Sequence, residues 1–138
     1  MDGFRILSVG IAMLVAFGGC SSEKRVPVFP VSGKVSFKGA APTGAQVVLH
    51  PVGSKEPTEV APTATVKDDG SFALTSYEPD DGAPAGDYVA VIQWFRTVPA
   101  LNGAGPNVLP KQYASAKSSP VKVSVSNGPV EIPPINIQ

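Results

Sequence analysis

The amino-acid sequence predicts an all-β fold, a seven-stranded antiparallel β-sandwich. Glycine and proline contribute 14 and 15 of the 138 residues, a composition typical of short strands joined by turns. Hydrophobic residues still make up 43% of the chain, which argues against disorder. Along residues 31–138 apolar residues alternate with polar ones, and the sequence there lacks the period of an amphipathic helix. The length is that of one domain.

Seven segments are predicted to form strands. The first, residues 31–38 (VSGKVSFK), alternates apolar and polar side chains as a half-buried strand does. Residues 87–95 (DYVAVIQWF) are apolar on both faces, which predicts a central strand. In the last segment, residues 129–137, Pro133 and Pro134 cannot donate ladder hydrogen bonds, so this strand is expected at an edge or with a bulge. The other strands are expected at residues 45–50, 61–66, 71–75 and 120–125.

The first 19 residues are predicted to be a cleaved signal peptide. Arg5 precedes the uncharged run 6–17, which is shorter than the ~20 apolar residues of a spanning helix and typical of a secretory leader. Gly18, Gly19 and Cys20 follow, and the segment resembles the lipobox of bacterial lipoproteins, in which the peptidase cuts before a cysteine that receives a diacylglyceryl group. Lipidation would account for the single cysteine of an exported chain. The alternative is that Cys20 is an ordinary residue of a leader.

The chain is therefore expected to have three parts. Residues 1–19 are the lipoprotein signal peptide, residues 20–30 a lipidated tether, and residues 31–138 the sandwich. Ser21, which follows the cysteine, resembles the residue that directs such proteins to the outer membrane. The expected location is the cell envelope, with the lipid anchor in the outer membrane. The formal net charge of zero argues against a nucleic-acid partner, because phosphate binding needs a basic excess.

Three stretches of the sandwich segment carry a family resemblance: VSGKVSFKGAAPTGAQVVLHP, ATVKDDGSFALT and APAGDYVAVI. Together they resemble the carboxypeptidase-regulatory-like domain, which implies a transthyretin-like (prealbumin-like) sandwich over about residues 31–138. Residues 109–128 are similar to the C-terminal part of small lipoproteins abundant in planctomycete bacteria. These are scaffold motifs and say little about activity. The matching positions are Gly33, Val35, Gly44, Ala45, Val47, Asp68, Gly70, Phe72, Gly86 and Tyr88.

No catalytic residue and no cofactor is predicted. His50 is the only histidine and stands at a strand end before Pro51, so a surface position is expected. Nucleophilic triads need an oriented histidine, and zinc sites need three or four ligands. The enzymes that share the transthyretin-like fold, hydroxyisourate hydrolase and the intradiol dioxygenases, rely on several histidines. An unrecognised hydrolase would require a pocket that combines His50 with an acid and a hydroxyl.

Acidic residues on two loops are a candidate calcium site. Asp68 and Asp69 stand in a predicted turn, and Asp80 and Asp81 stand in residues 78–86, which are expected to form a loop without a strand. Calcium takes about six to eight oxygen ligands, which paired acidic loops can supply. The alternative is turn chemistry, since Asp-Gly pairs are what tight turns require.

Trp94 and Arg96, at the end of the predicted central strand, are a candidate glycan contact. An exposed tryptophan can stack on a sugar ring. The alternative, which the sequence favours, is a tryptophan packed in the core, because Tyr88, Ala90 and Ile92 share its strand face.

These observations lead to one expected function and one alternative. The expected function is a non-enzymatic, lipid-anchored envelope sandwich with a structural or protein-interaction role, whose strand edges and residues 97–119 contact a partner. The alternative is a glycan- or calcium-binding envelope module. The expected partners are the membrane, through Cys20, and an envelope protein or glycan.

Overall fold

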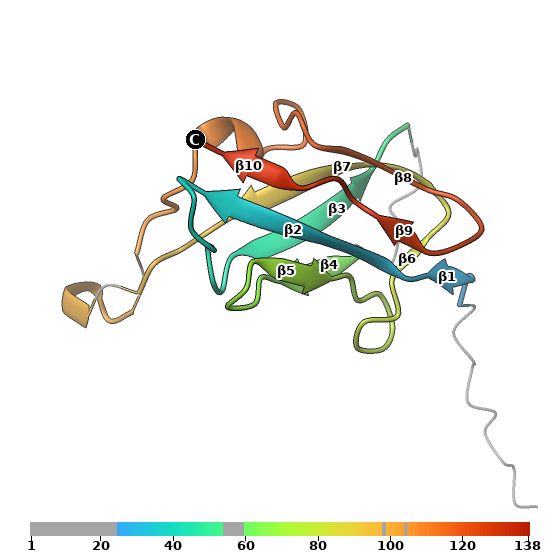
Figure 1. Cartoon of the computed structure of the whole chain (residues 1–138), viewed down its shortest axis with the longest axis horizontal. Helices are drawn as coiled ribbons and strands as arrows, with labels where there is room; N and C mark the ends of the chain where they lie inside the picture. Colours follow the sequence, from blue (N-terminus) through green and yellow to red (C-terminus); the bar gives the residue numbers. More distant parts are fainter. Residues whose placement is uncertain (1–24, 54–59, 98, 104) are drawn as a thin grey trace, which may run out of the picture.

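The fold was obtained as a computed structural model, which describes residues 25–53, 60–97, 99–103 and 105–138. Two four-stranded sheets face each other across one hydrophobic core, and a two-stranded ribbon lies at one end (Figure 1). The predicted signal peptide and Cys20 lie outside the described residues. The strands are β1 (Val28–Phe29), β2 (Val31–Phe37), β3 (Gln46–Pro51), β4 (Thr63–Thr65), β5 (Ser71–Ala73), β6 (Ala83–Pro84), β7 (Gly86–Gln93), β8 (Lys122–Val125), β9 (Val130–Glu131) and β10 (Ile135–Ile137).

The prediction of an all-β fold is confirmed, and each of the seven predicted segments contains a strand. One sheet has the order β10-β2-β5, with β9 also paired to β2, and the other has the order β4-β3-β7-β8. Strand β7 lies inside its sheet, as its two apolar faces predict, and Val91 stands opposite Val48 of β3. Thr63 and Thr75 form a bridge that joins the two sheets at the β4–β5 side.

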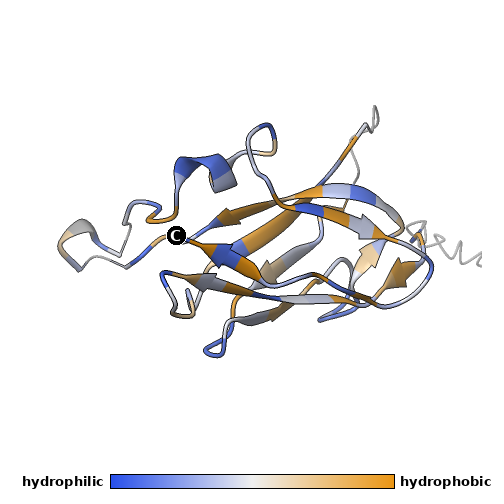
Figure 2. Ribbon diagram, turned by 45° about the horizontal axis from the view of Figure 1, so that its top comes forward, coloured by the Kyte–Doolittle hydropathy of each residue, from blue (hydrophilic) through white to orange (hydrophobic). Residues whose placement is uncertain are grey.

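The core follows from the alternation of the sequence. Val31 and Val35 of β2 are buried, whereas the polar residues between them point outward. Figure 2 shows the same alternation of hydrophobic and hydrophilic residues along the strands. Gly33 shares the inner face with Val31 and Val35, and a Cβ at this position would lie 2.8 Å from Cζ of Phe72. Gly33, from the first of the three family stretches, thus makes room for Phe72, from the second.

The long connection between β7 and β8 contributes to the core. It contains two short 3-10 helices, η1 (Pro99–Leu101) and η2 (Lys111–Ala114). Leu109 and Tyr113 are buried in the core cluster, and the Ser119 hydroxyl donates a hydrogen bond of 2.6 Å to the Ala90 carbonyl of β7. The second half of this connection therefore packs on β7, while η1 projects from the end of the sandwich (Figure 1). Of the contact surface expected at residues 97–119, Leu109, Tyr113 and Ser119 are therefore buried in the domain, whereas η1 is free of it.

Two expectations about strands were wrong in part. Residues 78–86 were expected to lack a strand, yet they contain β6, which pairs with β1 in antiparallel register. The last segment is interrupted at Pro133 and Pro134, and its two pieces β9 and β10 pair with β2 in parallel. Strand β10 does lie at a sheet edge, as predicted, but the sandwich is not wholly antiparallel. The prolines cannot donate to a ladder, which explains the interruption.

Candidate functional site

The lone histidine is placed at the surface. His50 is exposed near the end of β3, opposite Val89 of β7. Within the described parts of the chain, no three side chains of His, Cys, Asp or Glu come together in a way that could hold a metal ion.

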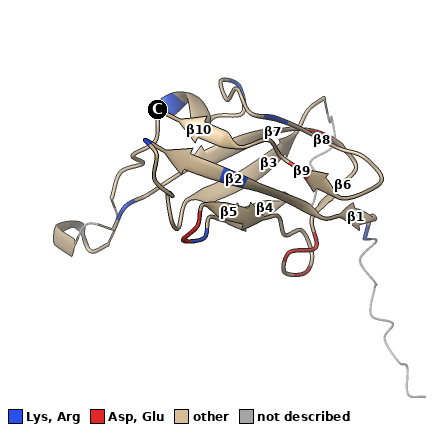
Figure 3. Ribbon diagram, in the orientation of Figure 1, with Lys and Arg blue, Asp and Glu red and all other residues tan. Residues whose placement is uncertain are grey.

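The four candidate calcium ligands lie on loops at opposite ends of β5, because residues 68–70 precede that strand and residues 76–82 follow it. Figure 3 shows the two acidic loops apart from each other. Asp69 accepts hydrogen bonds from the hydroxyl and the backbone N–H of Ser71, and both bonds lower the pKa of its carboxyl. The structure does not bring Asp68 and Asp69 together with Asp80 and Asp81.

Asp81 organises its own loop. Its carboxylate accepts hydrogen bonds from the backbone N–H groups of Ser76, Tyr77 and Glu78, at 2.7, 3.0 and 3.0 Å. Burial opposes ionisation, but the three donors together outweigh it and lower the pKa of the Asp81 carboxyl. Both Asp69 and Asp81 therefore have the turn role that was the alternative to calcium binding.

The candidate glycan contact is brought together at the end of the sandwich where β2 and β7 finish. The Arg96 guanidinium lies 5.4 Å from the centroid of the Trp94 ring, and Lys38 lies 5.3 Å from the centroid of Phe37. The two rings meet edge to face at 6.2 Å. We call these four residues, with the 55% exposed Phe95, the aromatic end.

Trp94 is fixed in this arrangement. Its indole N–H donates to the Thr43 carbonyl at 3.0 Å, and its backbone N–H donates to Oδ1 of Asn107 at 2.9 Å. The ring is half-buried against the core, and Arg96 stacks over it. The apolar side chain that is most available at this end is Phe95, which sequence reasoning missed because its strand was expected to be buried on both faces.

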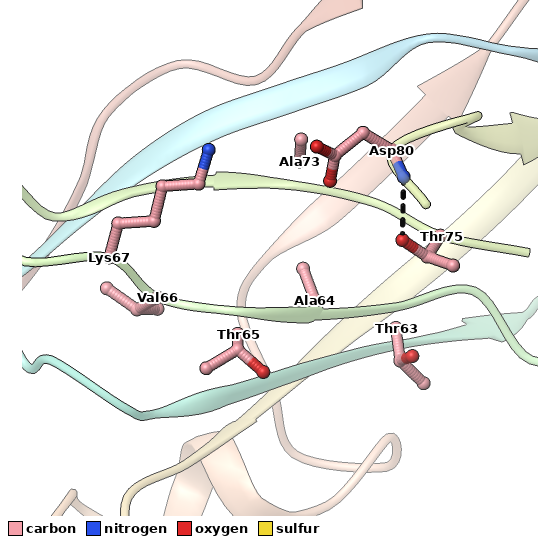
Figure 4. Close-up of a pocket in the computed structure, with 8 residues that line it drawn as sticks. All are labelled: Thr63, Ala64, Thr65, Val66, Lys67, Ala73, Thr75 and Asp80. Carbon is pink, nitrogen blue, oxygen red and sulfur yellow. Dashed lines mark hydrogen bonds between the residues drawn. The ribbon is translucent and has the colours of Figure 1, made fainter. Parts of the chain in front are cut away.

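Sequence reasoning also missed a groove between β4 and β5. The two strands are bridged at Thr63 and Thr75, and beside the turn that connects them the Lys67 N–H donates to the Ser71 carbonyl at 2.9 Å. Between these points the described strands share no further bridge, and a groove of about 470 Å³ opens there (Figure 4). Its lining consists of Thr63, Ala64, Thr65, Val66, Lys67, Ala73, Thr75 and Asp80.

The groove carries opposite charges at its rim. Figure 4 shows the Lys67 ammonium toward one end and the Asp80 carboxylate toward the other. Asp80 has a left-handed backbone (φ 59°), held by a hydrogen bond of 2.9 Å from its N–H to the Thr75 hydroxyl. This arrangement has room for water or a small polar group.

The comparisons with known proteins add no name to these sites. No protein-family model, no curated protein and no solved structure matches the chain. Among the described residues, no helix is both long and apolar enough to cross a membrane.

Proposed function

We propose that this chain is an exported protein of the bacterial cell envelope, anchored by a diacylglyceryl group on Cys20, with a non-enzymatic structural or protein-interaction role. The anchor is in the outer membrane, and residues 1–19 are removed on export. The sandwich belongs to the carboxypeptidase-regulatory-like, transthyretin-like type. Its partner is an envelope protein that contacts the strand edges or the projecting η1.

The sequence Gly18-Gly19-Cys20 after an uncharged run carries this proposal. The fold gives secondary support, because the residues of the family motifs have scaffold roles: Gly33 accommodates Phe72, and Tyr88 lies in the core with its hydroxyl bonded to the Pro84 carbonyl. Two of the candidate calcium ligands, Asp69 and Asp81, also have a structural role, because their carboxylates accept hydrogen bonds from backbone N–H groups of their own loops.

The proposal is tested by expressing the full chain in a bacterium that is fed an alkyne-bearing fatty acid. The wild type and Ser21→Ala should incorporate the label and sediment with membranes, whereas Cys20→Ala should do neither. An inhibitor of the lipoprotein signal peptidase should leave a lipidated precursor that is longer by 19 residues. A wild-type chain that is unlabelled and remains in the soluble fraction would refute the anchor.

A glycan-binding role is the second candidate, and the exposed Phe95 beside the Trp94–Arg96 stack favours it. Aromatic and guanidinium groups together suit sugar rings that carry acidic substituents. Co-sedimentation with insoluble cell-wall glycan tests this role. Phe95→Ala should reduce binding several-fold and Val52→Ala, a similarly exposed apolar residue, should not. Equal binding by both variants would remove this candidate.

A further inference from the structure

We propose that the sandwich lies directly against the bilayer, with its β1–β6 end facing the lipid headgroups and its aromatic end pointing away. The partner of the β1–β6 end is the surface of the membrane that holds the anchor. This inference rests on the proposed lipidation of Cys20. It concerns a different question, which is how the domain is held once the lipid is attached.

The segment expected to be a free tether is bound to the domain from its first described residue. The Val26 N–H donates to the Tyr77 hydroxyl at 3.2 Å, and Arg25 lies 5.3 Å from the Tyr77 ring centroid and 3.4 Å from a Glu78 carboxylate oxygen. Next, Val28–Phe29 forms β1 and pairs with β6. The exposed ion pair adds little by itself, so the strand pairing is the stronger part.

The end of this segment is fixed even more closely. The Pro30 carbonyl accepts a hydrogen bond of 2.8 Å from the N–H of Val130. At Gly82 (φ 104°), a Cβ would lie 1.7 Å from the Phe29 carbonyl oxygen and 2.8 Å from the Pro30 Cα. A backbone approach this close is possible only beside glycine. Residues 25–30 therefore belong to the domain.

The length of chain left over limits where the membrane can be. The step from Cys20 to Arg25 is five residues and spans at most about 18 Å when fully extended. A free tether as far as Pro30 would reach about 35 Å, enough to hold the sandwich well off the surface. With residues 25–30 bound to the domain, Arg25 at the β1–β6 end cannot lie farther from the anchored Cys20 than the shorter distance.

The surface of this end suits the position. Val26 and Val52 are 51% and 58% exposed, and Val52 extends β3 beside the start of β7, where its N–H donates to the Asp87 carbonyl. Figure 1 shows the end of β3 and strands β1 and β6 at the same end of the molecule, opposite η1. Exposed apolar side chains beside a lipid anchor can rest in the interfacial layer.

Energy transfer to the membrane tests this orientation. The lipidated full chain is reconstituted into phospholipid vesicles that contain a headgroup-labelled acceptor, with a donor dye on Ala85→Cys or on Ala100→Cys, both exposed. The two sites are separated by at least the length of β7, roughly 26 Å. We expect strong transfer from residue 85 and several-fold weaker transfer from residue 100. Inserting ten Gly/Ser residues between Lys24 and Arg25 should reduce the difference.

The outcomes separate this inference from the proposed function. If the purified chain carries no lipid and does not bind vesicles, the proposed function fails. If it is lipidated and bound but both dyes transfer equally, or the inserted linker changes nothing, the orientation is wrong while the anchor stands.

Discussion

The carbonyl oxygen of Phe29 fills the space that a side chain at residue 82 would need. The ideal Cβ position of Gly82 lies 1.7 Å from that oxygen, and the glycine also has a positive φ of 104°. Any other residue at position 82 would therefore suffer both backbone strain and a steric clash with Phe29. The pairing of β1 with β6 depends on this glycine.

Gly82→Ala should destabilise the protein by more than the strain of a positive φ alone would. We expect a loss of about 2–4 kcal/mol in the free energy of unfolding, because β1 must move away. Urea unfolding measures it. Gly39→Ala is the matched control, since Gly39 has φ 81° and no atom within 4 Å of its Cβ position, and it should cost about 1 kcal/mol. Equal losses for the two variants would mean that β1 is not held as described.

Phe72→Ala should create a cavity in the core. Phe72 is 1% exposed and packs against Gly33, so its truncation should lower the free energy of unfolding by about 3–5 kcal/mol. Phe95→Ala removes the same side chain at a 55% exposed position and should change stability by at most about 0.5 kcal/mol. Chemical denaturation of both variants measures these losses. Similar losses of unfolding free energy in the two variants would mean that Phe72 does not lie in the core as described.

Asp81→Asn should weaken the fold in a pH-dependent way. The pKa of Asp81 is lowered in the folded chain, so its contribution is complete above the unfolded value of 3.8 and is lost as the pH falls through the folded value. The variant should be less stable than the wild type by about 1–2 kcal/mol near pH 7, and the difference should shrink below about pH 4. Thermal unfolding across this range measures it.

Asp80→Asn is the control for that series. Asparagine tolerates the left-handed backbone at this position (φ 59°), and the N–H of residue 80 can still donate to Thr75. Its stability difference from the wild type near pH 7 should be small. If Asp80→Asn behaved like Asp81→Asn, the role given to the three backbone donors would be wrong.

Arg96→Gln should expose the indole of Trp94. Trp94 is the only tryptophan of the chain, so its fluorescence reports on this end alone. Without the guanidinium over the ring, quenching by acrylamide should increase about two-fold, with a cost of about 0.5–1 kcal/mol in stability. Arg25→Gln, which removes the corresponding contact with Tyr77, should leave the quenching unchanged. An unaltered signal in Arg96→Gln would show that the ring is shielded by other atoms.

Most of the fold was predicted from the alternation of apolar and polar residues along the strands. The strands β2, β3 and β7 have a regular apolar period or an apolar run, and each was found where that pattern placed it. Strands β1 and β6 have two residues each, too few to show a period, and β6 contains Pro84. They form because Gly82 lets two chain segments approach closely, which is a long-range relationship that no local pattern reveals.

Pairing direction and site geometry were harder to predict. The alternation of β10 is the same whether it pairs in parallel or antiparallel with β2, so its direction could not be inferred. For Trp94, the strand pattern indicated the inner face, but the strand ends just before it and leaves the ring half-buried. For Asp69 and Asp81, turn chemistry was the alternative to a calcium site, and both carboxylates accept hydrogen bonds from nearby backbone N–H groups, as Asx side chains do in turns.

The decisive measurement for the anchor is the mass of the N-terminal peptide of the membrane-extracted protein. We expect a peptide that begins at Cys20 and carries a diacylglyceryl group on its sulfur. A peptide that retains residues before Cys20, or one that begins there with an unmodified thiol, would contradict the proposed anchor.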